Sequence, residues 1–389
     1  MIKIARVAFL TFLLLSGSVN LSIAKQTDKR SEAQEILAQI LKDDSGVGIM
    51  AAVYRDGKLV WSGTAGFADL EAKTKMKSTH RLRIGSVSKP FTAVLALKLA
   101  ENNRLGLDKP IGQVIPENEE DLTGITPRSL GSHLAGIRQY DFSNFSEANN
   151  SRYFPLLKDS FQIYKDDLII AEPGSKFLYT SIGFNLLGAA IEHSTQTTFS
   201  KALSDKVTVP LDLRSTFTDS SIDVINDRGR FYTIGNPNPV FTWMKRDQII
   251  NTFFRDSSDY YPSGGLLSNA EDLAKFADRV FNSGFLSEKS KEIVKTPAKT
   301  SDGKQAEYSG SGERIVYSFG WEVRYKEDGS VRSYGHNGET NGAYALVRYF
   351  PKERISVGAI VNYNMVADEP AFFKLAGERL PEVFLKVDP

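Results

Sequence analysis

A serine followed three residues later by a lysine can carry out acyl transfer when both side chains project from the start of one helix. This spacing occurs at Ser22/Lys25, Ser86/Lys89 and Ser301/Lys304. Only the second pair begins an apolar helix, because the first lies in an N-terminal apolar segment and the third in a polar turn. Residues three apart on a helix have Cβ atoms roughly 5–6 Å apart, so the Lys89 amine can reach the Ser86 hydroxyl.

The backbone at Ser86 offers a further property that acyl transfer needs. The first N–H groups of a helix have no partner within it and lie at the positive end of its dipole. The Ser86 amide can therefore stabilise an oxyanion. The alternative is that Ser86 or Ser88 only caps the helix and that Lys89 is a surface lysine.

A second polar cluster lies in the loop ahead of a helix that begins near residue 182. There Tyr179 and Ser181 are two residues apart, and in an extended segment such residues point to the same side. Tyr179 can then share a proton with Ser86 or Lys89, and Ser181 can donate to a substrate carbonyl. The alternative makes Tyr179 a core aromatic residue and Ser181 a helix N-cap.

The third cluster is the glycine-rich segment 334–342, which the polarity of its residues predicts to be an interruption between two strands. Glycines such as Gly338 let the backbone approach a ligand closely. His336 can present its imidazole to a substrate carboxylate or to Tyr179, and the Glu339 amide can serve as a second oxyanion donor. The alternative is a tight hairpin turn with an exposed histidine.

The elements that must position these clusters are predicted to come from both chain ends. Asp56-Gly57 is a strong hairpin signal between strands 48–54 and 58–63. Further strands are expected at 318–325, 331–335, 342–350 and 355–362. A capping box at Ser31 predicts a helix with Ile36, Leu37, Ile40 and Leu41 on its inner face. A last helix is expected over 369–385, interrupted late by Pro381.

The middle of the chain, residues 90–312, is dominated by helical periodicity. Helices are predicted over 91–102 and 182–193, and a capping box at Ser268 predicts a third. No linker separates two independent domains. We therefore predict an α/β (α+β) fold in which an antiparallel sheet, built from residues of about 31–89 and 313–389 and flanked by terminal helices, receives a mainly helical insertion.

The N-terminus has the pattern of a signal peptide. Lys3 and Arg6 precede an apolar run over 7–15, and the small residues at 22–24 predict cleavage near Ala24. The mature chain would be a single catalytic domain of residues 25–389, secreted or periplasmic, with only transient membrane contact. An uncleaved anchor is the alternative, but the run is shorter than the ~20 residues of a bilayer span.

Composition excludes several other kinds of chemistry. The chain of 389 residues has 48 Lys and Arg against 47 Asp and Glu, so no basic field is present to bind nucleic acid. It has no cysteine, which excludes thiolate nucleophiles, disulfides and thiolate metal sites. Its four histidines lack metal-ligand spacing, so neither metal nor cofactor is expected. The sequence does not indicate an oligomeric state.

The three clusters, in this order, resemble the serine β-lactamase and penicillin-binding protein superfamily. The match is closest to the branch of class C β-lactamases and D-alanyl-D-alanine carboxypeptidases. It also extends to the mitochondrial β-lactamase-like serine protease and its bacterial relatives. The similar segments are 83–89, 132–137, 174–188, 262–266, 268–276, 319–321 and 336–338.

This resemblance implies the β-lactamase/DD-peptidase fold and an acyl-enzyme formed on Ser86, which water then releases. Lys89 would have to be partly neutral, which requires its pKa to fall from about 10.4. Tyr179 would pass the proton to the leaving group. The amides of Ser86 and Glu339 would stabilise the oxyanion, and the substrate would be a small molecule or a peptide.

Two residues depart from the β-lactamase pattern. Ser181 stands where class C enzymes have Asn, and His336 stands where β-lactamases have Lys. A neutral imidazole is a weaker anchor than an ammonium for an acidic antibiotic. The sequence thus predicts a serine hydrolase of peptides, D-amino-acid amides or esters. The alternatives are a penicillin-binding or wall-peptide-binding protein with little turnover, and a true β-lactamase.

Overall fold

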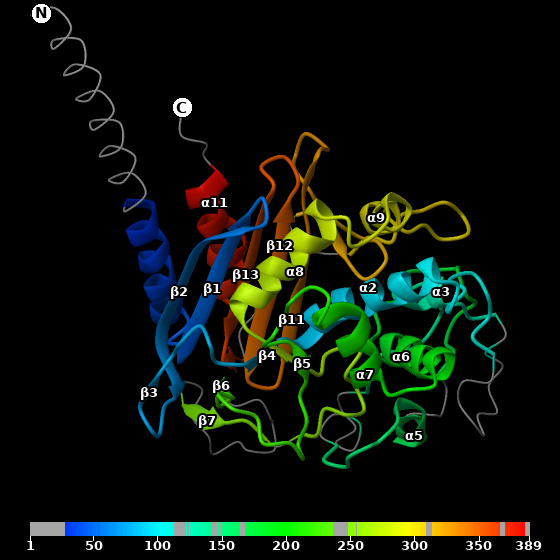
Figure 1. The fold of residues 1–389 in the computed structure, drawn as a ribbon, viewed down its shortest axis with the longest axis horizontal. Coiled ribbons are helices and arrows are strands. Elements are labelled where there is room, and N and C mark those ends of the chain that lie inside the picture. The colour runs from blue at the N-terminus through cyan, green and yellow to red at the C-terminus, as the bar shows by residue number, and fades with distance from the viewer. Residues whose placement is uncertain are drawn as a thin grey trace, which may run out of the picture.

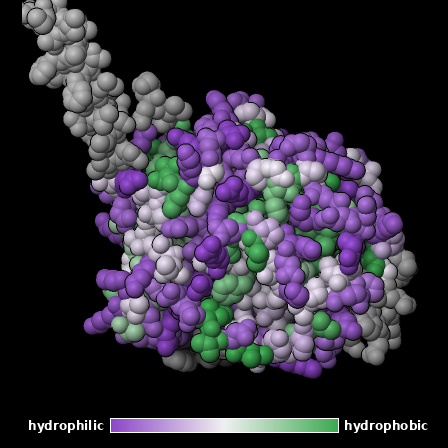
Figure 2. Space-filling view, viewed as in Figure 1, coloured by the Kyte–Doolittle hydropathy of each residue, from purple (hydrophilic) through white to green (hydrophobic). Residues whose placement is uncertain are grey.

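The computed structural model in Figure 1 shows a sheet whose two faces are covered by different sets of helices. It describes residues 28–112, 122, 124–141, 147, 150–163, 168–235, 248–253, 255–308, 313–365 and 370–385. The predicted signal peptide lies outside these residues. Within them, no helix is both long and apolar enough to cross a bilayer. The face in Figure 2 is largely hydrophilic, with apolar side chains in small separate groups.

The main sheet has eight strands in the order β3-β2-β1-β13-β12-β11-β10-β9. Strand β1 pairs with β13 in antiparallel register, Ala52 opposite Gly358. The prediction that both chain ends build one antiparallel sheet is therefore confirmed. Its strands are β1 (Gly48–Arg55), β2 (Lys58–Asp69), β3 (Thr74–Lys75), β9 (Ile315–Tyr317), β10 (Glu322–Tyr325), β11 (Val331–Thr340), β12 (Ala343–Phe350) and β13 (Ile355–Val361).

The β1–β2 hairpin turns at the predicted dipeptide. Asp56 and Gly57 have φ of 49° and 78°, the positive values that a two-residue hairpin turn matching the strand twist requires. Aspartate tolerates this conformation better than most residues, and glycine adopts it without steric cost. The local sequence thus explains where the first two strands reverse.

Strand β12 shows how the sheet separates two cores, because successive side chains of a strand face opposite sides. Tyr344, Leu346 and Phe350 belong to the apolar cluster beneath the terminal helices. Ala345 and Val347 belong to the cluster shared with the helical unit. Figure 1 shows the N-terminal helix, residues 28–43, and the C-terminal helix on one side, with α8 on the other.

The helical unit is organised around helix α2 (Ser88–Glu101), most of whose residues are buried on every side. Phe91 stacks on Phe276 of α8 with ring centroids 3.7 Å apart. The other helices are α3 (Pro127–Gly131), α5 (Leu157–Ser160), α6 (Ser181–Thr195), α7 (Phe199–Leu203), α8 (Ala270–Asn282) and α9 (Glu288–Lys295), with the turns η1 (Gly85–Val87), η2 (Phe161–Ile163) and η3 (Ser204–Thr208). A helix that is apolar all round must run through a core, as α2 does.

Two small sheets in this region were not predicted from the sequence. One has the order β14-β6-β7 and the other β4-β8-β5. Their strands are β4 (Leu82–Arg83), β5 (Phe217–Thr218), β6 (Tyr232–Ile234), β7 (Ile249–Asn251), β8 (Leu266–Ser268) and β14 (Tyr363–Met365). Strands of two or three residues are too short to show the alternation of polar and apolar residues by which a strand is recognised.

Three strand predictions were wrong in their bounds. The strand expected at 58–63 is longer, since β2 runs to Asp69. The segment 318–321 is a turn between β9 and β10, because Gly320 has φ 77° and its amide donates to Gly131 O at 2.8 Å. The segment 336–340 is not an interruption but the second half of β11, where His336 pairs with Val347. The polar residues there face a site instead of solvent, which sequence polarity cannot distinguish.

Three helix details also differ from the predictions. The N-terminal helix already includes residue 28, so Ser31 lies inside it. Helix α8 is capped by Asn269, whose side chain accepts from Asp272 N, and Ser268 belongs to β8. The last helix runs through Pro381 as α10 (Ala371–Lys374), the π-helical turn η4 (Leu375–Arg379) and α11 (Leu380–Leu385). The wider π turn accommodates the proline, which has no N–H to donate.

Asp44, at the end of the N-terminal helix, ties the two chain ends together. Its buried carboxylate accepts from the Ala371 amide at 2.7 Å, the Phe372 amide at 3.2 Å and the Tyr363 hydroxyl at 2.9 Å. The two amides belong to the first turn of α10, where intrahelical partners are missing.

We expect Asp44→Ala to lower the free energy of unfolding by about 3 kcal/mol, because it leaves three buried donors without an acceptor. Urea denaturation followed by circular dichroism measures this. The control is Asp43→Ala, since Asp43 is exposed and accepts a hydrogen bond from Gln39 in the neighbouring turn. It should change the free energy by less than about 0.5 kcal/mol. Equal effects of the two substitutions would contradict the assigned role of Asp44.

Candidate active site

Ser86 lies in the short turn η1 that leads into α2, and strand β11 packs directly against this turn. A Cβ atom on Gly85, whose φ is +50°, would lie 2.8 Å from Glu339 N. A Cβ atom on Gly338 would lie 2.2 Å from Ile84 O. Only glycine at both positions allows this approach, so the two backbones are interlocked beside the nucleophile.

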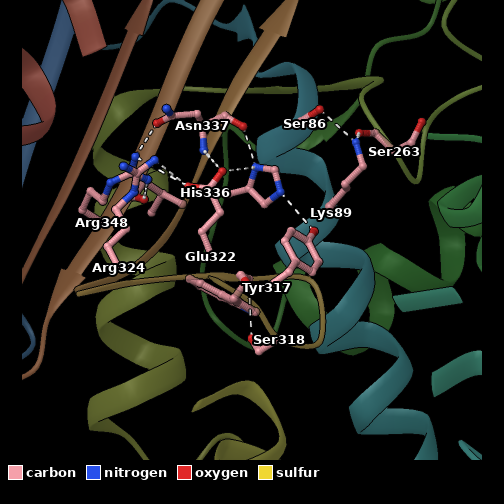
Figure 3. Close-up of polar contacts among 12 residues, drawn as sticks. Ser86, Lys89, Ser263, Tyr317, Ser318, Glu322, Arg324, His336, Asn337 and Arg348 are labelled. Carbon is pink, nitrogen blue, oxygen red and sulfur yellow. Dashed lines mark hydrogen bonds and ion pairs between the residues drawn. The ribbon is translucent and has the colours of Figure 1, made fainter. Parts of the chain in front are cut away.

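Lys89 reaches Ser86 from the first turn of α2. Its side chain is fully buried, and Nζ lies 2.8 Å from Ser86 Oγ, 2.9 Å from Ser263 O and 3.4 Å from Ser181 Oγ. Figure 3 shows the amine between Ser86 and Ser263. The alternative that Lys89 is a surface lysine is therefore wrong.

The charge of Lys89 is suppressed by its surroundings. Burial lowers the pKa of the amine to about 7, opposed only by the more distant carboxylate of Glu322. Removing an ammonium from water disfavours the charged form. Near neutral pH a large share of molecules therefore holds an uncharged amine beside Ser86.

Tyr179 approaches the same serine from the loop before α6. Its phenol is close enough to the Ser86 side chain for that side chain to affect its pKa, and Lys89 Nζ lies 4.9 Å from the centre of its ring. Burial raises the pKa of this phenol, against the opposing effect of the Ser86 side chain. Tyr179 is thus protonated at neutral pH and is placed to donate a proton.

His133 holds the backbone on both sides of Tyr179. Its carbonyl accepts from Leu178 N at 2.9 Å, and its Nδ1 accepts from Thr180 N at 3.1 Å. The imidazole packs against the Tyr179 ring with centroids 4.4 Å apart. Because Nδ1 accepts, Nε2 carries the proton, and burial lowers the histidine pKa well below its usual value. His133 thus ties down the backbone near the site.

Ser181 is the first residue of α6, while Thr180 is the cap, its hydroxyl accepting from Gly183 N. The alternative that Ser181 caps the helix is therefore wrong. The Ser181 amide donates to Gln139 Oε1 at 2.9 Å. Its hydroxyl is left facing Lys89, at the entrance to the group formed by Ser86, Lys89 and Tyr179.

His336 has both ring nitrogens engaged within the protein. Nδ1 lies 2.5 Å from Asn337 O, and since a carbonyl can only accept, Nδ1 carries the proton. Nε2 then accepts from the Tyr317 hydroxyl at 3.1 Å (Figure 3). Burial lowers the pKa of His336 to about 4, so the ring is neutral. Its centroid is 6.3 Å from that of Tyr179.

The Glu339 amide points to the open edge of β11. Strand β10 pairs with β11 only from Val331 to Gly335, and beyond it the Asn337 amide turns to the Glu322 side chain, 3.4 Å away. Amides two residues apart on a strand point to the same edge, so the Glu339 amide faces this edge too. The Ser86 amide precedes the first donor of η1, Val87 N, which bonds Ile84 O. The backbone of Glu339 thus lies beside the turn that carries Ser86.

The structure therefore brings Ser86, Lys89, Tyr179 and Ser181 together and places Gly338 and Glu339 beside them. Sequence reasoning missed the carbonyl of Ser263 and the two groups behind His336, which are Tyr317 and Glu322. Segments 262–266 and 319–321 were part of the resemblance, but no role followed from it. Every residue has a backbone carbonyl, so the residue type at position 263 could not indicate this contact.

Comparison with known proteins identifies the family. A family model described as β-lactamase matches residues 33–372. The chain belongs to the β-lactamase family. This membership confirms the predicted superfamily, fold class and class of enzyme, a serine hydrolase.

Two named relatives each align with about two thirds of the chain. The serine β-lactamase-like protein LACTB, mitochondrial, from Homo sapiens is 28% identical over 314 residues, which is 64% of this chain and 56% of the human protein. Esterase EstB from Burkholderia gladioli is 28% identical over 286 residues, 65% of this chain and 70% of EstB. The chain thus spans little more than half the length of the human relative.

The fold is shared with a solved D-amino acid amidase from Ochrobactrum anthropi SV3. The two structures superpose with a TM-score of 0.75 at 20% sequence identity, covering 92% of this chain and 99% of the amidase. At this identity the likeness concerns the fold alone.

The hydrogen bonds by which His133 holds the backbone on both sides of Tyr179 lead to a prediction for this β-lactamase-family site. We expect His133→Ala to lower the acylation rate about 10-fold to 100-fold, because the Tyr179 oxygen loses its fixed position. His133→Asn should lose less, since Asn keeps an acceptor and tolerates the φ of 57° found here. Stopped-flow acylation by a p-nitrophenyl ester gives the rates.

A double-mutant cycle with Tyr179→Phe separates this role from general destabilisation. If His133 acts through Tyr179, adding His133→Ala to Tyr179→Phe should slow acylation little further. Fully additive losses would show that His133 acts elsewhere.

Proposed function

We propose that the protein is a serine hydrolase that forms an acyl-enzyme on Ser86 and cleaves peptides, D-amino-acid amides or esters. The observation that carries the proposal is the convergence of a buried amine and a phenol on one hydroxyl. Lys89 Nζ is 2.8 Å from Ser86 Oγ and 4.9 Å from the centre of the Tyr179 ring, and the Tyr179 phenol is close enough to Ser86 for that side chain to affect its pKa.

The contacts of Lys89 fit an uncharged amine acting as base. A neutral amine has two N–H donors and one lone pair. The carbonyl of Ser263 and the hydroxyl of Ser181 can take the two donors, which leaves the lone pair for the Ser86 proton. This arrangement aims the base at the nucleophile.

In the proposed acylation, Ser86 Oγ bonds to the substrate carbonyl carbon and its proton passes to Lys89. The amides of Ser86 and Glu339 donate to the resulting oxyanion. Tyr179 gives its proton to the leaving group as the old bond breaks, and the Lys89 ammonium reprotonates Tyr179. Water then attacks the acyl-enzyme, and its proton returns to Ser86 by the same groups.

His336, in the third cluster (residues 334–342), favours substrates that carry no carboxylate at the position where an acidic antibiotic has one. His336 is neutral and bonds to Tyr317 and Asn337, so it offers no ammonium to an acidic antibiotic. Low turnover of β-lactams is therefore part of the proposal. The names of EstB, an esterase, and of the D-amino acid amidase support esters and D-amino-acid amides as the compounds to assay.

Export to the periplasm or the medium is also part of the proposal. Its support is the signal-like sequence alone, with basic residues ahead of the apolar run 7–15 and small residues at 22–24.

Covalent labelling tests the nucleophile. A fluorophosphonate probe should add one adduct to the wild-type protein by intact-mass measurement and none to Ser86→Ala, whose ester hydrolysis should fall at least about 10³-fold. Ser301→Ala is the matched control, because Ser301 and Lys304 repeat the spacing in a turn and the Ser301 hydroxyl bonds Gly174 O. It should label normally. Equal labelling of Ser86→Ala would overturn the proposal, and no adduct from several acylating probes would favour a binding protein.

The pH dependence tests the base. Lys89 must be neutral to accept a proton, so kcat/KM for a neutral ester should rise with pH and level off above about 7, the pKa to which burial lowers the amine. Lys89→Ala should remove this limb and lower kcat/KM about 10²-fold to 10⁴-fold. A limb that stays in place in Lys89→Ala would assign the titration to another group.

A further inference from the structure

A buried carboxylate, that of Glu322, lies next to His336 and Asn337 of the third cluster (residues 334–342). Glu322 projects from β10 with its side chain 7% exposed, and Figure 3 shows it between two arginines and the β11 strand. Its Oε2 is 2.8 Å from Arg324 Nη2 and 3.7 Å from Arg348 Nη2. Its Oε1 is 3.4 Å from Asn337 N and 3.8 Å from His336 Nδ1.

These contacts fix the part of β11 that borders the nucleophile. The Asn337 amide bonded to Glu322 is two residues before the Glu339 amide and points to the same edge. Arg348 bonds both the Asn337 side-chain oxygen and its own neighbouring carbonyl, Val347 O. Glu322 is thus the acceptor that holds this strand where β10 no longer pairs with it.

The charge of Glu322 also reaches the catalytic groups. Burial alone would raise the pKa of this carboxyl, but Arg324, His336 and Arg348 lower it to about 2, so it is ionised. Its negative charge favours the protonated form of Lys89 and of Tyr179. Charges interact over longer distances where water is excluded.

Other titratable groups surround both Glu322 and Lys89. Glu322 is faced by Arg324 from its own strand, His336 from β11 and Arg348 from β12, and Arg324 also pairs with Glu313. Lys89 is faced by Tyr179 and His133 from the helical unit and by His336 from β11. Both histidines are neutral near pH 7, so Glu322 is the one ionised carboxylate that acts on Lys89 among the described residues.

We propose that Glu322 is a positioning residue for the acyl-transfer reaction: through its contacts with Asn337 and Arg348 it holds the His336–Glu339 segment of β11 against the Ser86 turn, and its charge offsets part of the effect of burial on Lys89. This inference rests on the proposed function. On this inference, a buried residue of the main sheet affects the reaction through its neighbours, without itself contacting Ser86.

The test compares pH profiles of kcat/KM for a neutral p-nitrophenyl ester. Glu322→Gln removes the charge that favours the Lys89 ammonium, so the acidic limb should move to lower pH by about half a unit. Glu322→Asp keeps the charge but withdraws it from Asn337, so the limb should stay in place while kcat falls about 10-fold. A purely structural role would lower activity in both variants without moving the limb.

Glu313→Gln is the matched control, because Glu313 also pairs with Arg324 but its contact with β11 is at Arg332, outside the His336–Glu339 segment. Its limb should coincide with that of wild type. If Glu322→Gln does not fold, as thermal melting would show, Arg324→Gln replaces it. That variant leaves the carboxylate less neutralised and should move the limb to higher pH.

The outcomes separate the two proposals. Wild type that shows no Ser86-dependent hydrolysis defeats the proposed function itself. Ser86-dependent hydrolysis with the same limb in Glu322→Gln and Glu313→Gln, or with Arg324→Gln moving the limb downward, overturns only the role assigned to Glu322.

Discussion

The burial of the Lys89 amine is the constraint on which the rest of the site depends. An ammonium excluded from water is unstable unless a carboxylate pairs with it, and the polar atoms within reach of Nζ are two hydroxyls and a carbonyl. None of the described residues places a carboxylate against Nζ, which supports the proposal that Lys89 acts as a base. Every element near Nζ serves this end: α2 buries the stem, the Ser263 carbonyl orients the head, and the loop before α6 closes the remaining side.

The same principle extends in layers away from Ser86. Tyr179 is held by backbone contacts with His133, and His336 is held by Tyr317 and Asn337. The first full charges met behind these neutral groups are those of Glu322 and its arginines. The groups next to Lys89 are neutral, and the ionised groups, Glu322 and its arginines, lie farther out. The electrostatic field at the Lys89 amine can therefore change without a salt bridge in the space where the proposed substrate would bind.

The sequence predicted the parts of this structure that have local causes. The Asp56-Gly57 turn and the lysine one helical turn from Ser86 follow from turn chemistry and periodicity. The site could be predicted further only through family resemblance, because contacts such as that of Lys89 with the Ser263 carbonyl join segments distant in the chain and do not depend on residue type.

The errors have equally physical causes. Segment 336–340 was predicted to be an interruption because its side chains are polar, yet polar residues form a regular strand when a second polar layer receives them. The strand predicted at 318–325 breaks at Gly320, whose positive φ allows the chain to reverse against Gly131. Pro381 does not end the last helix, because the wider π turn ahead of it accommodates a residue that has no N–H to donate.

The interlock of Gly85 with Glu339 and of Gly338 with Ile84 has a consequence for the order of events during folding. Its two halves come from opposite ends of the polypeptide, and such distant contacts form late because closing long loops is entropically costly. Until the last strands join the sheet, Ser86 lacks the Glu339 amide that the proposed mechanism uses as an oxyanion donor. On that mechanism, the full site therefore exists only in the completed tertiary structure.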